Sequence, residues 1–314
     1  MIFRKKEKRE RIVNPFEREI FPNDSRMGML MNRITDNPKF SRISKPIVNI
    51  LMWAILVGGI LWTVRVVLFS YFFILYKVPT GSMLPTIEIG KHVIVNCRSY
   101  GLRVYNCDID NVRHGCISRK NGGNLPKHND IVVFNNPYYA NWDSVSFDKT
   151  KYFVKRCIAL PGDTFEIRDG YYHVSGFDGE LGYIKAQDEV EEVTRDSSSA
   201  TNQNIAYWTA PFYHPVYHWN MREMGPLYVP KKGDRIVLDT ITAPIYKKLI
   251  EWEIDKDIME KDGRFYVDGK PFMSHVMEQG YYFMAGDNAL YSTDSRYWGL
   301  VPEEFIVGKV VMIY

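Results

Sequence analysis

The longest apolar stretch of the chain lies near its start. Ile47–Val64 is an eighteen-residue run without a charged side chain, and apart from tryptophan only Asn49 and Thr63 carry side-chain hydrogen-bonding groups. About 20 apolar residues cross the hydrocarbon core of a bilayer, so this run is a transmembrane helix candidate. Beyond Arg65, the aromatic-rich stretch Val66–Tyr76 is typical of a membrane interface. We therefore predict one transmembrane helix over residues 47–68.

The remainder of the chain shows the short alternating or continuous apolar runs of β-strands, separated by turn signals. Asp268-Gly269 predicts a hairpin, and Pro244–Ile254 is the best helical pattern beyond the apolar run. The predicted fold class is mainly β: a single transmembrane helix followed by an all-β domain. The expected strands are His92–Val95, Asp130–Phe134, Tyr152–Leu160, Phe165–Arg168, Arg235–Leu238, Arg264–Val267, Tyr281–Met284 and Phe305–Ile313.

These patterns divide the chain into three parts. Residues 1–46 form a basic leader, residues 47–68 the transmembrane helix, and residues 69–314 one large domain with a less regular region at about 170–260. Within that region residues 185–204 are polar, acidic and rich in serine, which favours an exposed loop.

Charge is concentrated in the leader. Residues 1–46 hold twelve Lys and Arg against six Asp and Glu, a charge of +6, so the remainder of a chain with a net charge of +3 carries −3. A basic leader on a slightly acidic body does not indicate a nucleic-acid partner. By the positive-inside rule the leader stays cytoplasmic, and the domain after the helix lies on the extracytoplasmic side of the cytoplasmic membrane. The leader is too long for a cleavable signal peptide.

A serine stands in a constrained segment just after the predicted helix. Pro79–Thr86 reads PTGSMLPT, in which two prolines restrict the backbone around Ser82 and Gly81 permits close approach of a substrate. A structural turn has the same appearance, so the serine alone does not establish a site.

A lysine in a predicted strand strengthens the functional interpretation. In Tyr152–Leu160, Phe153, Lys155 and Cys157 share one face of the strand, so Lys155 lies between two apolar neighbours. Burial on such a face lowers the pKa of a lysine from about 10.4 towards about 8, where the neutral amine serves as a base.

Four ordered motifs resemble those of the bacterial type I signal peptidases. They are PTGSMLPT at Pro79–Thr86, DIVVF at Asp130–Phe134, VKRCIALPGD at Val154–Asp163 and GDNALYSTDSRYWG at Gly286–Gly299. The resemblance extends from about Arg65 to Tyr314. It implies a membrane-anchored serine endopeptidase with an all-β catalytic domain, which removes signal peptides from exported preproteins after small residues. The implied partners are these preproteins and the lipid bilayer, with no cofactor and no metal.

The resemblance also implies residue roles. Ser82 corresponds to the nucleophile and Lys155 to the general base of a Ser/Lys dyad. The Thr80 hydroxyl and the Ser82 backbone N–H correspond to the oxyanion hole. Supporting roles fall to Ser292, which aims the lysine, and to three charged residues expected to form ion pairs: Asp287, Asp294 and Arg296.

The chain departs from the family pattern in its last motif. An Arg-Asp-Asn triplet usually follows Gly-Asp-Asn, whereas Ala289-Leu290-Tyr291 stands here. This departure is consistent with an altered support of the site. It is also the one feature that favours an alternative, a catalytically decayed binding module. Another alternative is a different membrane-tethered Ser/Lys processing peptidase, including a self-cleaving one with Ser198–Ala200 as a weak candidate site.

Two further sets of residues contain potential metal ligands. The cysteines Cys97, Cys107, Cys116 and Cys157 match no zinc pattern, and a disulfide between Cys107 and Cys116 is predicted because both lie in a polar, loop-like stretch. His214 and His218 are four residues apart, but Pro215 argues against the helix that would turn both towards one metal.

Overall fold

The computed structural model describes residues 29, 38–108, 112–120, 124–138, 140–195 and 216–314. The chain divides into two compact units, Met1–Phe69 and Ser70–Tyr314. Each unit is described by itself.

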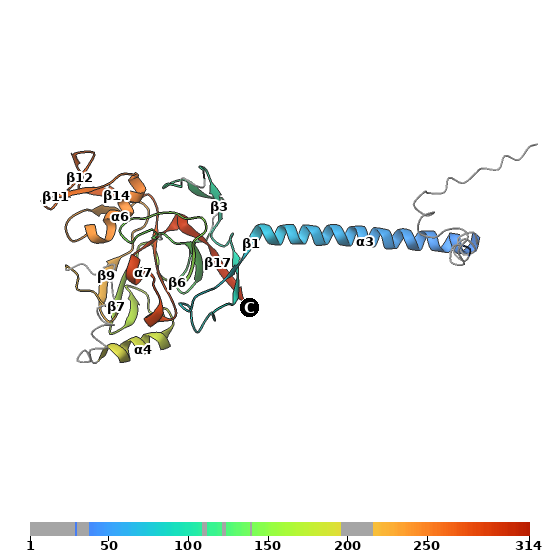
Figure 1. The fold of residues 1–314 in the computed structure, drawn as a ribbon, viewed down its shortest axis with the longest axis horizontal. Coiled ribbons are helices and arrows are strands. Elements are labelled where there is room, and N and C mark those ends of the chain that lie inside the picture. The colour runs from blue at the N-terminus through green and yellow to red at the C-terminus, as the bar shows by residue number, and fades with distance from the viewer. Residues whose placement is uncertain (1–28, 30–37, 109–111, 121–123, 139, 196–215) are drawn as a thin grey trace, which may run out of the picture. The chain divides into compact units, whose positions relative to one another are not determined.

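Helix α3 (Pro38–Phe72) dominates the described part of the first unit (Figure 1). Its segment Pro46–Val67, with a mean hydropathy of 2.2, is long and apolar enough to cross a membrane. Apolar side chains along it, such as Trp53 and Ile55, are exposed, as expected for a helix in contact with lipid. The predicted span of 47–68 falls inside this helix, whose length and composition suit a membrane anchor. The aromatic stretch after it is divided, because the helix ends at Phe72 and a strand begins at Phe73.

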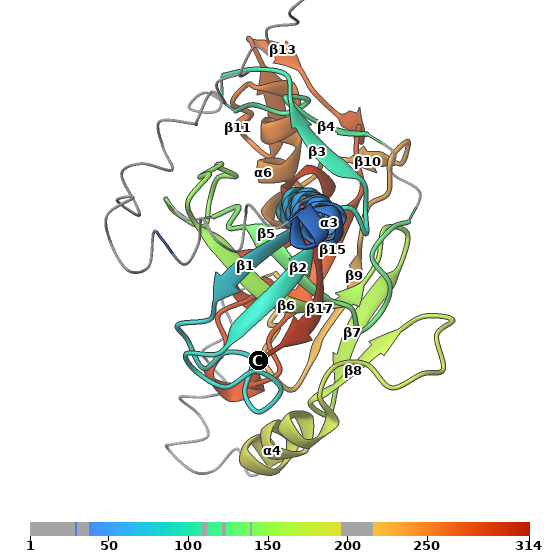
Figure 2. The ribbon, with the colours of Figure 1, turned by 90° about the vertical axis from the view of Figure 1, so that its right-hand side faces the viewer.

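A seven-stranded antiparallel sheet forms the centre of the second unit (Figure 2). Neighbouring strands pair in the order β1-β2-β17-β5-β6-β15-β16, so segments from both ends of the unit lie side by side. The strands are β1 (Phe73–Lys77), β2 (His92–Asn96), β5 (Ile131–Asn135), β6 (Tyr152–Ala159), β15 (Tyr281–Ala285), β16 (Val301–Pro302) and β17 (Ile306–Ile313).

Four smaller sheets complete the β-structure. They are made of β3 (Leu102–Tyr105) with β4 (Ile117–Lys120); β7 (Thr164–Arg168) between β8 (Tyr171–Val174) and β9 (Met224–Tyr228); β10 (Arg235–Val237) with β14 (Ser274–Val276); and β12 (Arg264–Val267) between β11 (Met259–Lys261) and β13 (Lys270–Pro271). The mainly β prediction is confirmed, and each of the eight expected strands is present within a residue or two of its predicted bounds.

Helices are few in the described part of this unit. They comprise α4 (Ile184–Arg195), α6 (Ala243–Ile254), α7 (Ser295–Trp298) and the 3-10 turns η1 (Ala289–Tyr291) and η2 (Glu303–Phe305). Helix α6 matches the predicted helix.

The expectation of a loop over residues 185–204 is wrong for its first half. Residues 184–195 form α4, whose buried side chains Ala186, Val190 and Thr194 are spaced four apart on one helical face. The acidic residues that suggested a solvated loop lie on the other faces of this helix. Residues 196–204, with Ser198–Ala200, lie outside the described residues.

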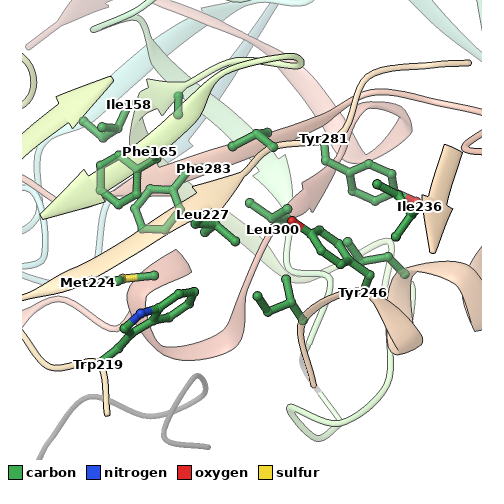
Figure 3. Packing of buried hydrophobic residues seen from close by; sticks show 14 of the residues in the cluster. Ile158, Phe165, Trp219, Met224, Leu227, Ile236, Tyr246, Tyr281, Phe283 and Leu300 are labelled. Atoms are coloured by element: carbon green, nitrogen blue, oxygen red, sulfur yellow. The ribbon is translucent and has the colours of Figure 1, made fainter. Parts of the chain in front are cut away.

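The largest apolar core joins the central sheet to β7, β9 and α6 (Figure 3). The rings of Phe165 and Phe283 are 4.1 Å apart at their centroids, and Leu227 and Leu300 are fully or almost fully buried beside them. A second cluster contains Cys157, Tyr282 and Met284, and a third contains Met83 and Val133. The middle of the central sheet, including β15 and the second half of β6, is thus buried on both faces.

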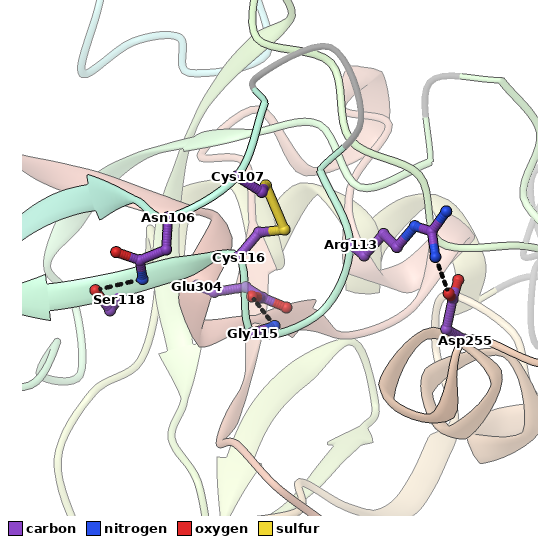
Figure 4. The surroundings of a disulfide bond; sticks show 8 residues. All are labelled: Asn106, Cys107, Arg113, Gly115, Cys116, Ser118, Asp255 and Glu304. Atoms are coloured by element: carbon purple, nitrogen blue, oxygen red, sulfur yellow. Dashed lines mark hydrogen bonds and ion pairs between the residues drawn. A yellow bond between two sulfur atoms is a disulfide. The ribbon is translucent and has the colours of Figure 1, made fainter.

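The predicted disulfide between Cys107 and Cys116 is present (Figure 4). It closes the loop between β3 and β4. The same loop is held to the rest of the unit by the Arg113–Asp255 ion pair and by the Gly115 N–H, which donates to the Glu304 carboxylate. Cys97 and Cys157 are both buried free thiols.

Candidate active site

Ser82 lies in a tight turn that follows β1. The Leu84 N–H donates to the Gly81 carbonyl at 3.1 Å, and the Ile87 N–H donates to the Met83 carbonyl at 2.8 Å. The side chains of Met83 and Ile87 are fully buried in the third core cluster. Burial of these two side chains anchors the turn to the core, whereas Ser82 itself is half-buried.

Lys155 reaches Ser82 from the middle of β6. Its Nζ lies 2.6 Å from the Ser82 Oγ and 3.1 Å from the Ser292 Oγ. The lysine side chain is 3% exposed, and its Nζ lies 5.5 Å from the centre of the Phe153 ring. Strand β6, the Ser82 turn and the segment after β15 thus bring three polar groups to one point.

Burial determines the state of the lysine. The pKa of Lys155 is lowered from its usual 10.5 to about 8, mainly by desolvation, and the Arg296 charge contributes to the lowering. The carboxylates of Asp294 and Asp287 act in the opposite direction. A substantial fraction of the amine is therefore neutral slightly above neutral pH, which a general base requires.

The buried carboxylate of Asp294 has its own partner. Asp294 and Arg296 form a two-pronged ion pair at 2.7–2.8 Å, and both are almost fully buried. The Asp294 Oδ2 also accepts the Gly286 N–H at 2.8 Å. Burial by itself would raise the pKa of Asp294, but the charge and hydrogen bonds of Arg296 outweigh burial and lower it.

Asp287 is paired in the same manner with a residue that the sequence did not indicate. Arg156 donates through Nε and Nη2 to the two Asp287 carboxylate oxygens at 2.7 and 2.5 Å. Arg156 follows Lys155 on β6 and points to the opposite face of the strand. Its adjacency to the predicted base was the available signal.

Gly286 and Asn288 join the Ser82 turn to the segment after β15. The Asn288 N–H donates to the Ser82 carbonyl at 3.1 Å, and the Asn288 Nδ2 donates to the Gly81 carbonyl at 3.0 Å. A Cβ on Gly286 would lie 2.1 Å from the Ser292 Oγ and 2.4 Å from the Ser82 carbonyl oxygen. Only glycine fits there.

The remaining predicted residues are placed as follows. Thr80 lies two residues before Ser82 and is exposed, and its contribution to an oxyanion hole stays a prediction. His214 lies outside the described residues. Within the described ranges, no group of three or more His, Cys, Asp or Glu side chains is arranged to hold a metal ion.

Comparison with known proteins identifies the family. The sequence model of the family described as "Signal peptidase, peptidase S26" matches residues 47–314. The chain belongs to this family, and it is a serine endopeptidase and a hydrolase.

Curated relatives carry the name signal peptidase I. The chain is 26% identical over 254 residues to the protein of Buchnera aphidicola subsp. Acyrthosiphon pisum, covering 78% of this chain and 69% of that protein. It is 28% identical over 240 residues to the protein of Aquifex aeolicus, covering 76% and 74%. A crystal structure of a signal peptidase I from Enterococcus faecalis V583 is also similar, with 19% sequence identity and a TM-score of 0.28. The match covers 60% of this chain and 98% of that chain.

Proposed function

We propose that this protein is a signal peptidase I, which removes signal peptides from exported preproteins through a Ser82/Lys155 dyad. The observation that carries the proposal is the distance of 2.6 Å between the Lys155 Nζ and the Ser82 Oγ at a buried lysine. A neutral amine at that distance accepts the hydroxyl proton without a histidine.

The reaction has two halves. As the Ser82 Oγ attacks the scissile carbonyl carbon, Lys155 takes the hydroxyl proton, and collapse of the tetrahedral intermediate breaks the C–N bond while Lys155 returns the proton to the leaving amine. Lys155 then takes a proton from water as that water attacks the acyl ester, and Ser82 regains its proton. The Ser82 N–H and the Thr80 hydroxyl are proposed to stabilise the oxyanion.

The surrounding residues hold this geometry. Ser292 accepts a hydrogen bond from Lys155 and thereby aims the amine at Ser82. Asp294 and Asp287 are each paired with an arginine, Arg296 and Arg156. Neither carboxylate therefore forms an ion pair with Lys155 that would keep the lysine protonated.

The proposed topology follows from charge and hydropathy. The leader 1–46 is cytoplasmic, residues 47–68 cross the cytoplasmic membrane once, and the catalytic domain 69–314 lies on the extracytoplasmic side. There the apolar core of a signal peptide is held in the same bilayer as the enzyme. The preferred substrate has small residues such as alanine at positions −1 and −3 of the cleavage site.

The test uses the purified full-length protein in detergent with a preprotein substrate. We expect cleavage after the signal peptide by the wild type, none by Ser82→Ala, and strongly reduced cleavage when the −1 alanine of the preprotein is replaced by lysine. Equal rates for both preproteins would favour a different Ser/Lys processing peptidase. Folded wild-type protein without Ser82-dependent cleavage would indicate a binding module and overturn the proposal.

A further inference from the structure

The turn η1 carries a residue of the site at each end. Asn288, just before it, binds the backbone carbonyls of Gly81 and Ser82, and Ser292, just after it, binds the amine of Lys155. The Tyr291 N–H closes the turn by donating to the Asn288 carbonyl at 3.0 Å. A shift of this turn would therefore move both contacts to the dyad together.

The middle of the turn packs against α4. Ala289 is 2% exposed and forms a small separate apolar cluster with Ala186 and Val190 of α4 and with Met221. Leu290 is partly buried against the same cluster. Within the described residues, no hydrogen bond or ion pair links α4 to η1, so apolar packing is the main connection between them.

Helix α4 is itself held firmly in place. The Gln187 side chain accepts the Tyr172 N–H at 2.8 Å and donates to the Leu181 carbonyl at 2.6 Å. The turn at Gly170 presses on the helix, since a Cβ there would lie 3.2 Å from the Glu191 backbone nitrogen. Figure 2 shows α4 beside β8. The helix is therefore a fixed surface against which η1 rests.

Met221 is supported from a second direction. Its Sδ accepts a hydrogen bond from the Tyr297 hydroxyl at 3.8 Å, and Tyr297 is the neighbour of Arg296 in α7. The side chain of Met221 is 2% exposed. The apolar cluster is thus bounded by α4, by η1 and by the helix that follows the charged pair.

We propose that α4, through Val190 and together with the adjoining Met221, is a positioning element that sets the η1 turn and thereby holds Ser292 and Asn288 against the Lys155/Ser82 dyad. These are positioning residues and touch no substrate. The inference rests on the proposed function. It assigns to an acidic helix of the irregular region a part in catalysis that its surface charge does not suggest.

The test compares two matched truncations in the full-length protein. Val190→Ala removes two methyl groups from the cluster, and Val229→Ala removes the same groups from a fully buried site in the largest core. We expect Val190→Ala to lower kcat about tenfold with KM changed less than about twofold, because small misplacements of reacting groups cost up to about 100-fold. Val229→Ala and the outer-face variant Glu189→Ala should retain wild-type kcat.

Two further readouts separate positioning from loss of stability. Water admitted around Lys155 by a loosened turn should raise the apparent pKa of the pH–rate profile of Val190→Ala, a change that Val229→Ala should not show. In a Ser292→Ala background, Val190→Ala should reduce kcat by a smaller factor than it does in the wild type, because two residues that act partly through one contact are non-additive. The conservative variant Val190→Ile should retain most of the wild-type activity.

The outcomes are distinguishable. If the wild type cleaves in a Ser82-dependent way and Val190→Ala matches Val229→Ala in kcat and pH profile, the inference is wrong and the proposed function stands. Additive losses in the double variant would also overturn it. If Val190→Ala does not fold, Met221→Leu is measured in the same way, with the same expected separation of kcat from KM.

Discussion

The side-chain amide of Asn288 donates a hydrogen bond of 3.0 Å to the carbonyl oxygen of Gly81, 207 positions earlier in the chain. The backbone N–H of the same asparagine binds the next carbonyl, that of Ser82. Asn288 thus fixes the backbone of the turn that carries Ser82. These two bonds fix the backbone from which the Ser82 hydroxyl extends to within 2.6 Å of the Lys155 Nζ.

Replacing this asparagine should reduce activity more than stability. Asn288→Asp keeps the shape but removes the amide donor, and we expect kcat to fall about tenfold or more, since displacing a reacting group by even 1 Å costs up to about 100-fold. The free energy of unfolding should fall by about 1 kcal/mol, the usual net value of one hydrogen bond. Initial rates and thermal melting measure the two effects. Wild-type kcat in this variant would show that the turn holds itself.

The pH dependence of cleavage should follow Lys155. With its pKa lowered to about 8, the amine loses its proton as pH rises through that value, so kcat/KM should increase with an apparent pKa near 8. Lys155→Arg keeps the charge but cannot release its proton, and it should be inactive. Substantial turnover by purified Lys155→Arg, with Ser82→Ala inactive in the same preparation, would mean that another group is the base.

The same pKa predicts a pH-dependent stability. The folded pKa of about 8 lies below the usual value of 10.5, so between these pH values the unfolded chain binds more protons and stability rises with pH. Lys155→Met removes this contribution. We expect the variant's advantage in unfolding free energy to shrink by about 3 kcal/mol between about pH 7 and pH 11. A constant difference between the two proteins across this range would show that the pKa of Lys155 is unshifted.

Removing the Cys107–Cys116 disulfide should affect stability and spare catalysis. The bond closes a short loop of sequence separation 9. On the chain-entropy model its loss destabilises the protein by about 2–3 kcal/mol. The loop is fixed to Asp255 and Glu304 and not to the dyad, so kcat should be unchanged. Melting of the Cys107→Ser/Cys116→Ser variant, compared with wild type under reducing and oxidising conditions, measures this; equal melting in both would contradict it.

The membrane anchor should matter for membrane-held substrates. A chain that begins at Ser70 keeps β1, which pairs with β2 from Phe73 to Lys77, and we expect it to fold. It should cleave short soluble peptides like the full-length enzyme but membrane-held preproteins more slowly, because the helix no longer concentrates it at the bilayer. A chain beginning near Lys77 would lose β1 and is the less suitable variant. If the Ser70 form matched the full-length enzyme in activity on both substrates, the anchor would have no catalytic role.

Much of the site was predictable because its chemistry lies in local patterns. Alternation along Tyr152–Leu160 placed Lys155 between Phe153 and Cys157, and both belong to the same core cluster in the structure. The strands were predictable for the same reason, since eight of them carry a clear apolar period. Strands as short as β13 and β16, of two residues each, have no period to detect.

The contacts between distant segments could not be predicted. The binding of Asn288 to Gly81 depends on how two segments meet in space, and the sequence offers no local sign of it. Helix α4 was missed because Asp188, Glu189, Glu191 and Glu192 dominate the composition and obscure the four-residue spacing of its few buried side chains. Tertiary packing against η1 supplies the stability that such a polar helix lacks alone.

The contacts of the Ser82 turn with Gly286 and Asn288 have a consequence for the synthesis and folding of the chain. During synthesis Ser82 and Lys155 emerge long before Asn288 and Ser292, so a partly made chain has this serine and lysine without the contacts that hold them. Strand β15 pairs with β6, and Gly286 follows that strand directly, so this pairing places Gly286 and Asn288 against the Ser82 turn. On the proposed function, a chain that lacks Asn288 and Ser292 has an incomplete site and should not cleave preproteins.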